Sequence, residues 1–190
     1  PREERAQGLV EAVKHGAVLD ASHLEAVEHA VESLLGADPG PTAEIVLASV
    51  ALKAGVVDAD EREAGYRQVL NFGHTIGHAV EAAAGYRLGH GSCVAFGMRV
   101  EAAIGERLGV TEPGTGARLA SLLERLVGAV RPEVRLDDVT AYLGADKKAR
   151  AGRARFVLLE RLGRVAADGG WSREVPDEVV AAELGAALES

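Results

Sequence analysis

The organisation of this chain is decided by one stretch, Leu70-Asn71-Phe72-Gly73-His74-Thr75-Ile76-Gly77-His78-Ala79-Val80-Glu81, which is followed by His90-Gly91-Ser92-Cys93-Val94-Ala95. On a helix, His74 and His78 are four residues apart, so their imidazoles project from the same face. Gly73 and Gly77 leave room for another backbone to approach. His90 follows a Gly-Tyr-Arg-Leu-Gly turn that allows it to fold back on the pair. The stretch therefore indicates a site for a metal or an anion.

A simpler explanation is that these histidines are ordinary core or surface residues, which is the usual role of a lone histidine. Three of the six histidines of the chain, however, fall within the seventeen residues 74–90. An i,i+4 pair alone is a weak signal, and the flanking glycines and the third histidine shift the balance toward a binding site.

Composition limits the class of protein. The chain has 190 residues, 47% of them apolar, without a run of eighteen apolar residues, which predicts a soluble globular domain rather than a membrane protein. Its first five residues are largely charged and do not resemble a signal peptide, and its one cysteine cannot form an internal disulfide, so we expect a cytoplasmic protein. The net charge of −8 argues against binding to nucleic acid.

The hydrophobic pattern predicts a mainly α fold with a small β-hairpin. Glycines and prolines at 36–41 mark a turn between helices, with Pro41 in the first turn of the next helix. That helix is apolar on nearly all sides, which predicts a buried central helix. The expected elements are helices at 3–19, 42–56, 92–109, 114–128 and 137–144, a hairpin formed by 153–159 and 163–167, and a closing helix after Pro176.

Several charged or reactive side chains have an ordinary structural explanation. Glu11 and Lys14 are three residues apart on a helix, and from spacing alone a surface ion pair explains them. Lys53, on the apolar helix, can extend its amine to the surface. The acidic stretch at 58–63 fits a solvated turn, and Lys147 lies in a predicted glycine-flanked loop. Cys93 fits a small buried residue better than a metal ligand.

The stretch 67–81 resembles the signature of the 3-dehydroquinate synthase family. Further blocks resemble that family in the same order, and together they cover almost the whole chain. These blocks are 8–16, 52–57, 60–65, His90-Gly91 with 94–98, Asp146-Lys147-Lys148, and Arg155-Phe156-Val157-Leu158-Leu159.

The resemblance implies that residues 1–190 are the C-terminal, metal- and substrate-binding domain of a two-domain enzyme. In that family an N-terminal α/β domain holds NAD⁺, and the present sequence has no Gly-x-Gly-x-x-Gly fingerprint of such a domain. The chain begins at Pro1, close to a family block, so we expect the NAD-binding domain to be encoded upstream or in a separate chain, and we expect this chain alone to be inactive.

The resemblance also assigns roles to individual residues. It implies a zinc or cobalt ion bound by Glu11, His74 and His90, and a substrate that is a seven-carbon sugar acid phosphate, converted with NAD⁺ to 3-dehydroquinate and phosphate. The implied carboxylate contacts are Lys53 and Arg67, the phosphate contacts are Asn71, His78 and Lys147, and the further active-site residues are Lys14 and Glu63.

One residue departs from the family pattern. The family usually has His-Gly-Glu where this chain has His90-Gly91-Ser92. Ser92 either orients His90 through a hydrogen bond or marks a related sugar phosphate cyclase. Two further interpretations of the chain are a metal-dependent alcohol dehydrogenase of related build and a non-catalytic domain that packs on a partner. The expected partners are the substrate, the NAD-binding domain and a second copy of the enzyme in a homodimer.

Overall fold

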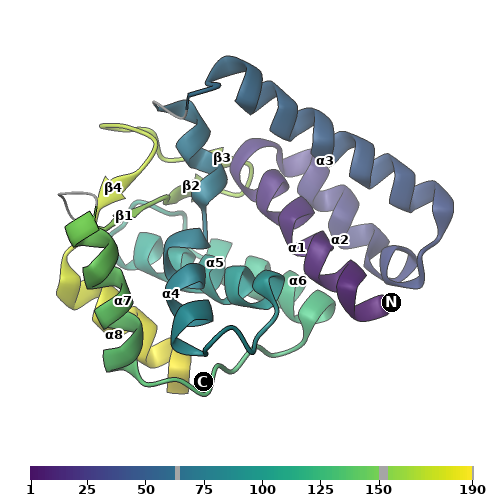
Figure 1. Cartoon of the computed structure of the whole chain (residues 1–190). Coiled ribbons are helices and arrows are strands. Elements are labelled where there is room, and N and C mark those ends of the chain that lie inside the picture. The colour runs from purple at the N-terminus through teal and green to yellow at the C-terminus, as the bar shows by residue number, and fades with distance from the viewer. Residues whose placement is uncertain (63–64, 150–153, 190) are drawn as a thin grey trace.

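The computed structural model describes residues 1–62, 65–149 and 154–189, with the backbone alone for 146–149. Figure 1 shows a largely helical molecule with short strands at one side. Of the helices described, none is long and apolar enough to cross a membrane. The elements are α1 (Arg2–Leu19), α2 (Ala21–Gly36), α3 (Pro39–Ala59), the 3-10 helix η1 (Tyr66–Asn71), α4 (His74–Ala83), α5 (His90–Arg107), α6 (Thr115–Val127), α7 (Leu136–Ala149), β1 (Arg155–Phe156), β2 (Leu159–Arg161), β3 (Arg164–Val165), β4 (Arg173–Glu174) and α8 (Asp177–Glu189).

Helix α5 lies at the centre of the molecule and is buried on both sides (Figure 1). Val94 and Met98 on one side join the core formed with α1, α2 and α6. Phe96 and Ile104 on the other side join a second core with α4, α7, α8 and the strands. The predicted core helix at 92–109 is confirmed, and α5 connects the two halves of the hydrophobic interior.

The prediction that the helix at 42–56 is a buried central helix is wrong. Helix α3 exists and carries Pro41 in its first turn, but it lies at the edge of the molecule in Figure 1. Val46, Leu47 and Val50 are 49%, 69% and 59% exposed. A helix that is apolar all round has no polar face, so its sequence cannot indicate which side packs. Here the side that carries Ile45 packs against α1 and α2.

The bounds of helix α2 were not predicted, although the expected turn between helices at 36–41 implies a helix that ends there. Asp20 caps its N-terminus and accepts hydrogen bonds from the backbone N–H groups of Ser22 and His23. An aspartate before an apolar helical pattern is a standard start signal, so this element was within reach of sequence reasoning.

The strands confirm the predicted hairpin only in part. β2 and β3 pair antiparallel around Gly163, as expected. β1, which belonged to the predicted hairpin, pairs instead with β4, so that Arg155 lies opposite Glu174. Strands of two residues are too short to show an alternating pattern, and β4 therefore could not be predicted.

The later helices agree with the predictions except at one boundary. Helix α6 and the closing helix α8 lie where they were expected. Helix α7 continues to Ala149, so Asp146-Lys147-Lys148 is helical rather than a loop as predicted.

Helices α4 and α5 touch at glycines, as Gly73 and Gly77 suggested. A Cβ atom on Gly77 would lie 3.0 Å from the carbonyl oxygen of Cys93, and one on Gly97 would overlap the carbonyl oxygen of Gly73. Because both of these contacts involve backbone atoms, neither can be relieved by a side-chain rotation.

We expect Gly97→Ala to lower the unfolding free energy by about 3 kcal/mol or more, since the new methyl group forces two helix backbones apart. Gly55→Ala is the matched control, because a Cβ atom there meets nothing within 4 Å. That control should stabilise α3 by about 0.5–1 kcal/mol. Urea denaturation of both variants checks this, and similar stabilities would contradict the close approach.

Candidate metal and anion site

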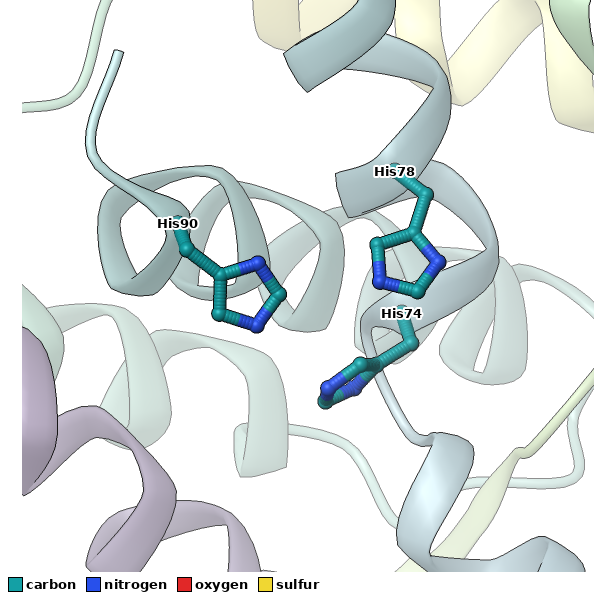
Figure 2. A group of neighbouring side chains, drawn as sticks. All are labelled: His74, His78 and His90. Carbon is teal, nitrogen blue, oxygen red and sulfur yellow. The ribbon is translucent and has the colours of Figure 1, made fainter. Parts of the chain in front are cut away.

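The three histidines of the quoted stretch face one another. Gly73, with a left-handed φ of 77°, turns the chain into α4, where His74 and His78 lie one turn apart. His90 is the first residue of α5. The ring centroids are 5.2, 5.5 and 5.7 Å apart, and one ligand nitrogen from each ring lies within 4.8 Å of the others (Figure 2). The predicted convergence of His74, His78 and His90 is present.

Two of these rings are oriented by hydrogen bonds through Nδ1. His74 Nδ1 lies 3.2 Å from the carbonyl oxygen of Phe72, and His90 Nδ1 lies 3.3 Å from Oε2 of Glu81. When Nδ1 carries the proton and donates to these oxygens, Nε2 presents a lone pair that can bind a metal. Glu81 was not predicted as a site residue, although it ends the quoted stretch.

Glu11 of α1 reaches the same place from a distant part of the chain. Its Oε1 lies 3.6 Å from Nε2 of His74, and its Oε2 accepts a hydrogen bond from Lys14 Nζ at 2.7 Å. Within the described residues, Oε1 is buried and has no hydrogen-bond partner. Two ligands of a tetrahedral zinc ion are about 3.4 Å apart, so the Glu11–His74 distance suits a shared ion.

Two ligand sets are therefore compatible with this geometry. One is the predicted set of Glu11, His74 and His90, and the other replaces Glu11 with His78. The first set offers one carboxylate oxygen and two imidazole nitrogens, and the second offers three imidazole nitrogens. Zinc and cobalt bind donors of both kinds, so either set fits such an ion. The unpartnered carboxylate oxygen of Glu11 favours the first set, because a buried acceptor without a partner is costly.

Burial and charge set the protonation states at this site. Burial lowers the pKa of His74 to about 4, and the nearby Lys14 contributes to this lowering, so the ring is neutral at neutral pH. Burial raises the pKa of Glu11, but Lys14 and His74 outweigh that effect and the pKa ends below its usual value. Burial also lowers the pKa of Lys14 despite the opposing effect of Glu11. The site thus presents a carboxylate and a neutral imidazole to an incoming cation.

Ser92 does not orient His90, so that prediction is wrong. Its hydroxyl accepts a hydrogen bond from Gln7 Nε2 at 2.9 Å, and its backbone N–H donates to Gln7 Oε1 at 2.8 Å. The side chain of Gln7 also fills the space that a Cβ atom on Gly89 would occupy, and a Cβ atom on Gly91 would overlap the backbone carbonyl oxygen of Gln7. Sequence reasoning missed Gln7. Its side-chain amide links α1 to the start of α5 through these two hydrogen bonds.

A cavity of about 680 Å³ opens beside the histidines. Asn71 and His78, both predicted phosphate contacts, line it together with His74. The remaining lining residues are Gln68, Thr75, Ala79, Tyr142, Leu143, Arg155, Val157 and Ser172. The cavity has the size of a small-molecule site and polar groups at its walls.

The structure does not bring every predicted residue into this cavity. Arg67 is directed to the carbonyl oxygen of Glu61, 3.0 Å from its Nη1, and is not among the lining residues. Lys53 is exposed on α3. It lies close enough to Lys14 to contribute to the lowered pKa of Lys14. Glu63 and the side chain of Lys147 lie outside the described residues.

Cys93 is a core residue, as expected. It is fully buried, and burial raises the pKa of its thiol to about 11. A neutral thiol inside the core is not a metal ligand.

Glu101 is a buried acid that sequence reasoning missed. Its side chain is fully buried on α5, and its Oε2 accepts a hydrogen bond from the backbone N–H of Gly73 at 2.9 Å. Burial raises its pKa to about 8, although backbone groups of Gly73, Ile76 and Val157 act in the opposite direction. Glu101 therefore holds the turn that leads into His74.

Comparisons with known proteins show the family to which this chain is related. Residues 8–149 match the family described as 3-dehydroquinate synthase C-terminal. The chain is 44% identical over 168 residues to a 3-dehydroquinate synthase from Symbiobacterium thermophilum, covering 87% of this chain and 47% of the relative. The chain thus spans about half the length of that relative.

Solved structures show the same fold at lower identity. A 2-deoxy-scyllo-inosose synthase complexed with carbaglucose-6-phosphate, NAD⁺ and Co²⁺ matches with a TM-score of 0.84 and 23% identity, over 97% of this chain and 52% of that chain. A 2-epi-5-epi-valiolone synthase from Streptomyces hygroscopicus subsp. jinggangensis 5008, with NAD⁺ and Zn²⁺ bound, matches with a TM-score of 0.83 and 23% identity, over 99% of this chain and 52% of that chain.

Glu101 gives a prediction about pH. The pKa of Glu101 is about 8 in the folded protein, above the usual 4.5, so the folded state binds the Glu101 proton more tightly than the unfolded state does. The stability that this proton contributes is therefore lost as pH rises from 4.5 through 8. We expect the unfolding free energy of the metal-free wild type, relative to Glu101→Gln, to fall by up to about 1.4 kcal/mol per pH unit in this window. Urea denaturation at several pH values measures the difference. Parallel pH profiles of the two proteins would contradict the prediction.

Proposed function

Because the chain belongs to the 3-dehydroquinate synthase family, we propose that it is the metal- and substrate-binding half of an enzyme that converts 3-deoxy-D-arabino-heptulosonate 7-phosphate into 3-dehydroquinate and phosphate. The observation that supports the proposal is that Glu11 and His90 both lie next to His74, which lines a cavity of about 680 Å³. These residues come from α1, α4 and α5, so the fold assembles the site from separate parts of the sequence.

Glu11, His74 and His90 are the proposed ligands of a zinc or cobalt ion. When bound there, the ion supplies the Lewis acidity that lowers the pKa of a substrate hydroxyl, and NAD⁺ accepts the hydride from the same carbon. The two structurally similar cyclases support these cofactors, since both were solved with NAD⁺, one with Co²⁺ and the other with Zn²⁺.

The residues around the ligands bind and orient the substrate in this proposal. Lys14, with its lowered pKa, holds a proton at Nζ against Glu11 and can pass it to a substrate oxygen. Asn71 and His78 line the cavity and contact the phosphate, with Lys147 as a further phosphate contact. Glu63 completes the set of proposed active-site residues.

The proposed carboxylate contacts are Lys53 and Arg67. Lys53 lies near Lys14, which places positive charge at one side of the site. Arg67 does not line the cavity and its Nη1 donates to the carbonyl oxygen of Glu61, so its side chain has to turn toward the cavity to contact a substrate there. An arginine–carboxylate pair, which can form two hydrogen bonds, is stronger than the neutral bond it replaces, so substrate binding can drive this change.

A second candidate is another sugar phosphate cyclase. Arg67 and Lys53 lie outside the cavity, and one of the similar synthases was solved in complex with carbaglucose-6-phosphate. A substrate of that kind carries a phosphate without a carboxylate and does not need the pair. Ser92, in place of the usual glutamate, is compatible with this candidate as well.

The proposed partner in either case is an N-terminal NAD-binding domain outside residues 1–190. The relatives are about twice as long as the chain, which supports an N-terminal NAD-binding domain as the other half. The proposed enzyme acts in the reducing cytoplasm and forms a homodimer.

The metal proposal is tested with the metal-free full-length protein and Co²⁺, followed by calorimetry and visible absorption. Removing a ligand leaves the ion with too few donors, so Glu11→Gln and His90→Ala should each weaken Co²⁺ binding about a hundredfold or more. His78→Ala should retain the affinity. His29→Ala, on the exposed side of α2, is the control. Loss of Co²⁺ in His78→Ala with retention in Glu11→Gln would assign the ion to the three histidines instead.

The substrate is tested by phosphate release from the full-length enzyme with NAD⁺ and Zn²⁺. We expect a higher kcat/KM for the heptulosonate phosphate than for a hexose 6-phosphate, which lacks a carboxylate. Arg67→Ala should raise the KM for the heptulosonate about ten- to a hundredfold, because a charge-assisted contact is lost, and should leave the hexose phosphate unaffected. A preference for the hexose phosphate would identify the second candidate.

A further inference from the structure

The described residues that line the cavity beside the histidines include a permanent positive charge, which belongs to Arg155. Among the described residues that line it, Arg155 is the one with a permanent charge, and none is an aspartate or glutamate. The whole chain has a net charge of −8, so a wall without carboxylates is unlike the rest of the molecule. Such a cavity favours an anion.

Arg155 is held in place by its neighbours. Its Nε donates to the hydroxyl of Ser172 at 2.9 Å, and its Nη2 donates to the carbonyl oxygen of Ser172. The Ser172 hydroxyl donates in turn to Oε1 of Gln68 at 2.6 Å. Ser172 is only 7% exposed, and both Ser172 and Gln68 line the cavity. A guanidinium fixed in this way loses little further side-chain entropy when it binds a ligand.

The backbone of Arg155 is tied to the histidine-bearing helix. Thr75, the residue after His74, donates its hydroxyl proton to the carbonyl oxygen of Arg155 at 2.8 Å. Arg155 also lies opposite Glu174 in the backbone pairing of β1 with β4. The position of the guanidinium is therefore set relative to His74 and His78, which also line the cavity.

We propose that Arg155 binds the phosphate group of the substrate, together with Asn71 and His78. The guanidinium has further N–H donors besides those taken by Ser172, and its flat fork suits phosphate oxygens. The role was not predicted from the sequence, where Arg155 was part of an expected hairpin. This inference rests on the proposed function, because the ligand is taken to be the phosphate of that substrate.

Inorganic phosphate is the probe, and the full-length protein is used metal-free so that phosphate cannot bind to the ion. Calorimetry should show phosphate binding by the wild type and a loss of about ten- to a hundredfold in Arg155→Ala. Arg155→Lys keeps the positive charge without the paired donors of the guanidinium, and it should lose less phosphate affinity than Arg155→Ala. Arg164→Ala is the control, since this exposed arginine pairs with Glu160 and does not line the cavity.

Two further measurements separate binding from folding and from the proposed function. Co²⁺ affinity, which depends on other residues, should be the same in Arg155→Ala as in the wild type, and in the assembled enzyme KM should rise far more than kcat falls. Unchanged phosphate affinity in Arg155→Ala, or no phosphate binding by the wild type, would overturn the role of Arg155. Neither result would bear on the metal ligands, and a failure of the metal tests with phosphate binding intact would reject the proposed function alone.

Discussion

The contact between the backbones of α4 and α5 is the constraint on which the site depends. Gly97 of α5 lies against the carbonyl oxygen of Gly73, and Gly77 lies against the carbonyl oxygen of Cys93, so a side chain at either glycine would separate the helices. His74 directly follows Gly73, and His90 begins α5. The distance between these imidazoles is therefore set by glycine contacts in the core. Glu101 reinforces the contact by accepting a hydrogen bond from Gly73.

Helix α1 adds the carboxylate and is fixed to the same point. Gln7 forms two hydrogen bonds with Ser92 at the start of α5. One turn further along α1, the side chain of Glu11 faces His74. Burying Lys14 is costly, and the ion pair with Glu11 offsets part of this cost. A buried lysine that is retained beside a carboxylate and an imidazole is more informative about function than about stability.

Sequence reasoning located the histidines, the core helix at 92–109 and the need for glycines, because spacing and residue size determine these features directly. It placed α3 in the centre, because an all-apolar helix does not show which face is covered. In the structure Leu47 of α3 is exposed, which shows that this placement is wrong. It missed Gln7, Glu101 and Arg155, whose roles arise from contacts between residues far apart in the chain. Ser172, for example, directly precedes β4, and the two-residue pairing of β1 with β4 brings it next to Arg155. Strands this short carry no sequence pattern.

The central claim is that α1, α4 and α5 together form a metal site of mixed ligands. Its most direct test is an anomalous difference map from crystals of the full-length protein loaded with Co²⁺. The account predicts one peak within bonding distance of Glu11 Oε1 and of the Nε2 atoms of His74 and His90, at about 2.0–2.2 Å. A peak bound by His74, His78 and His90 with Glu11 still paired to Lys14 alone would contradict it.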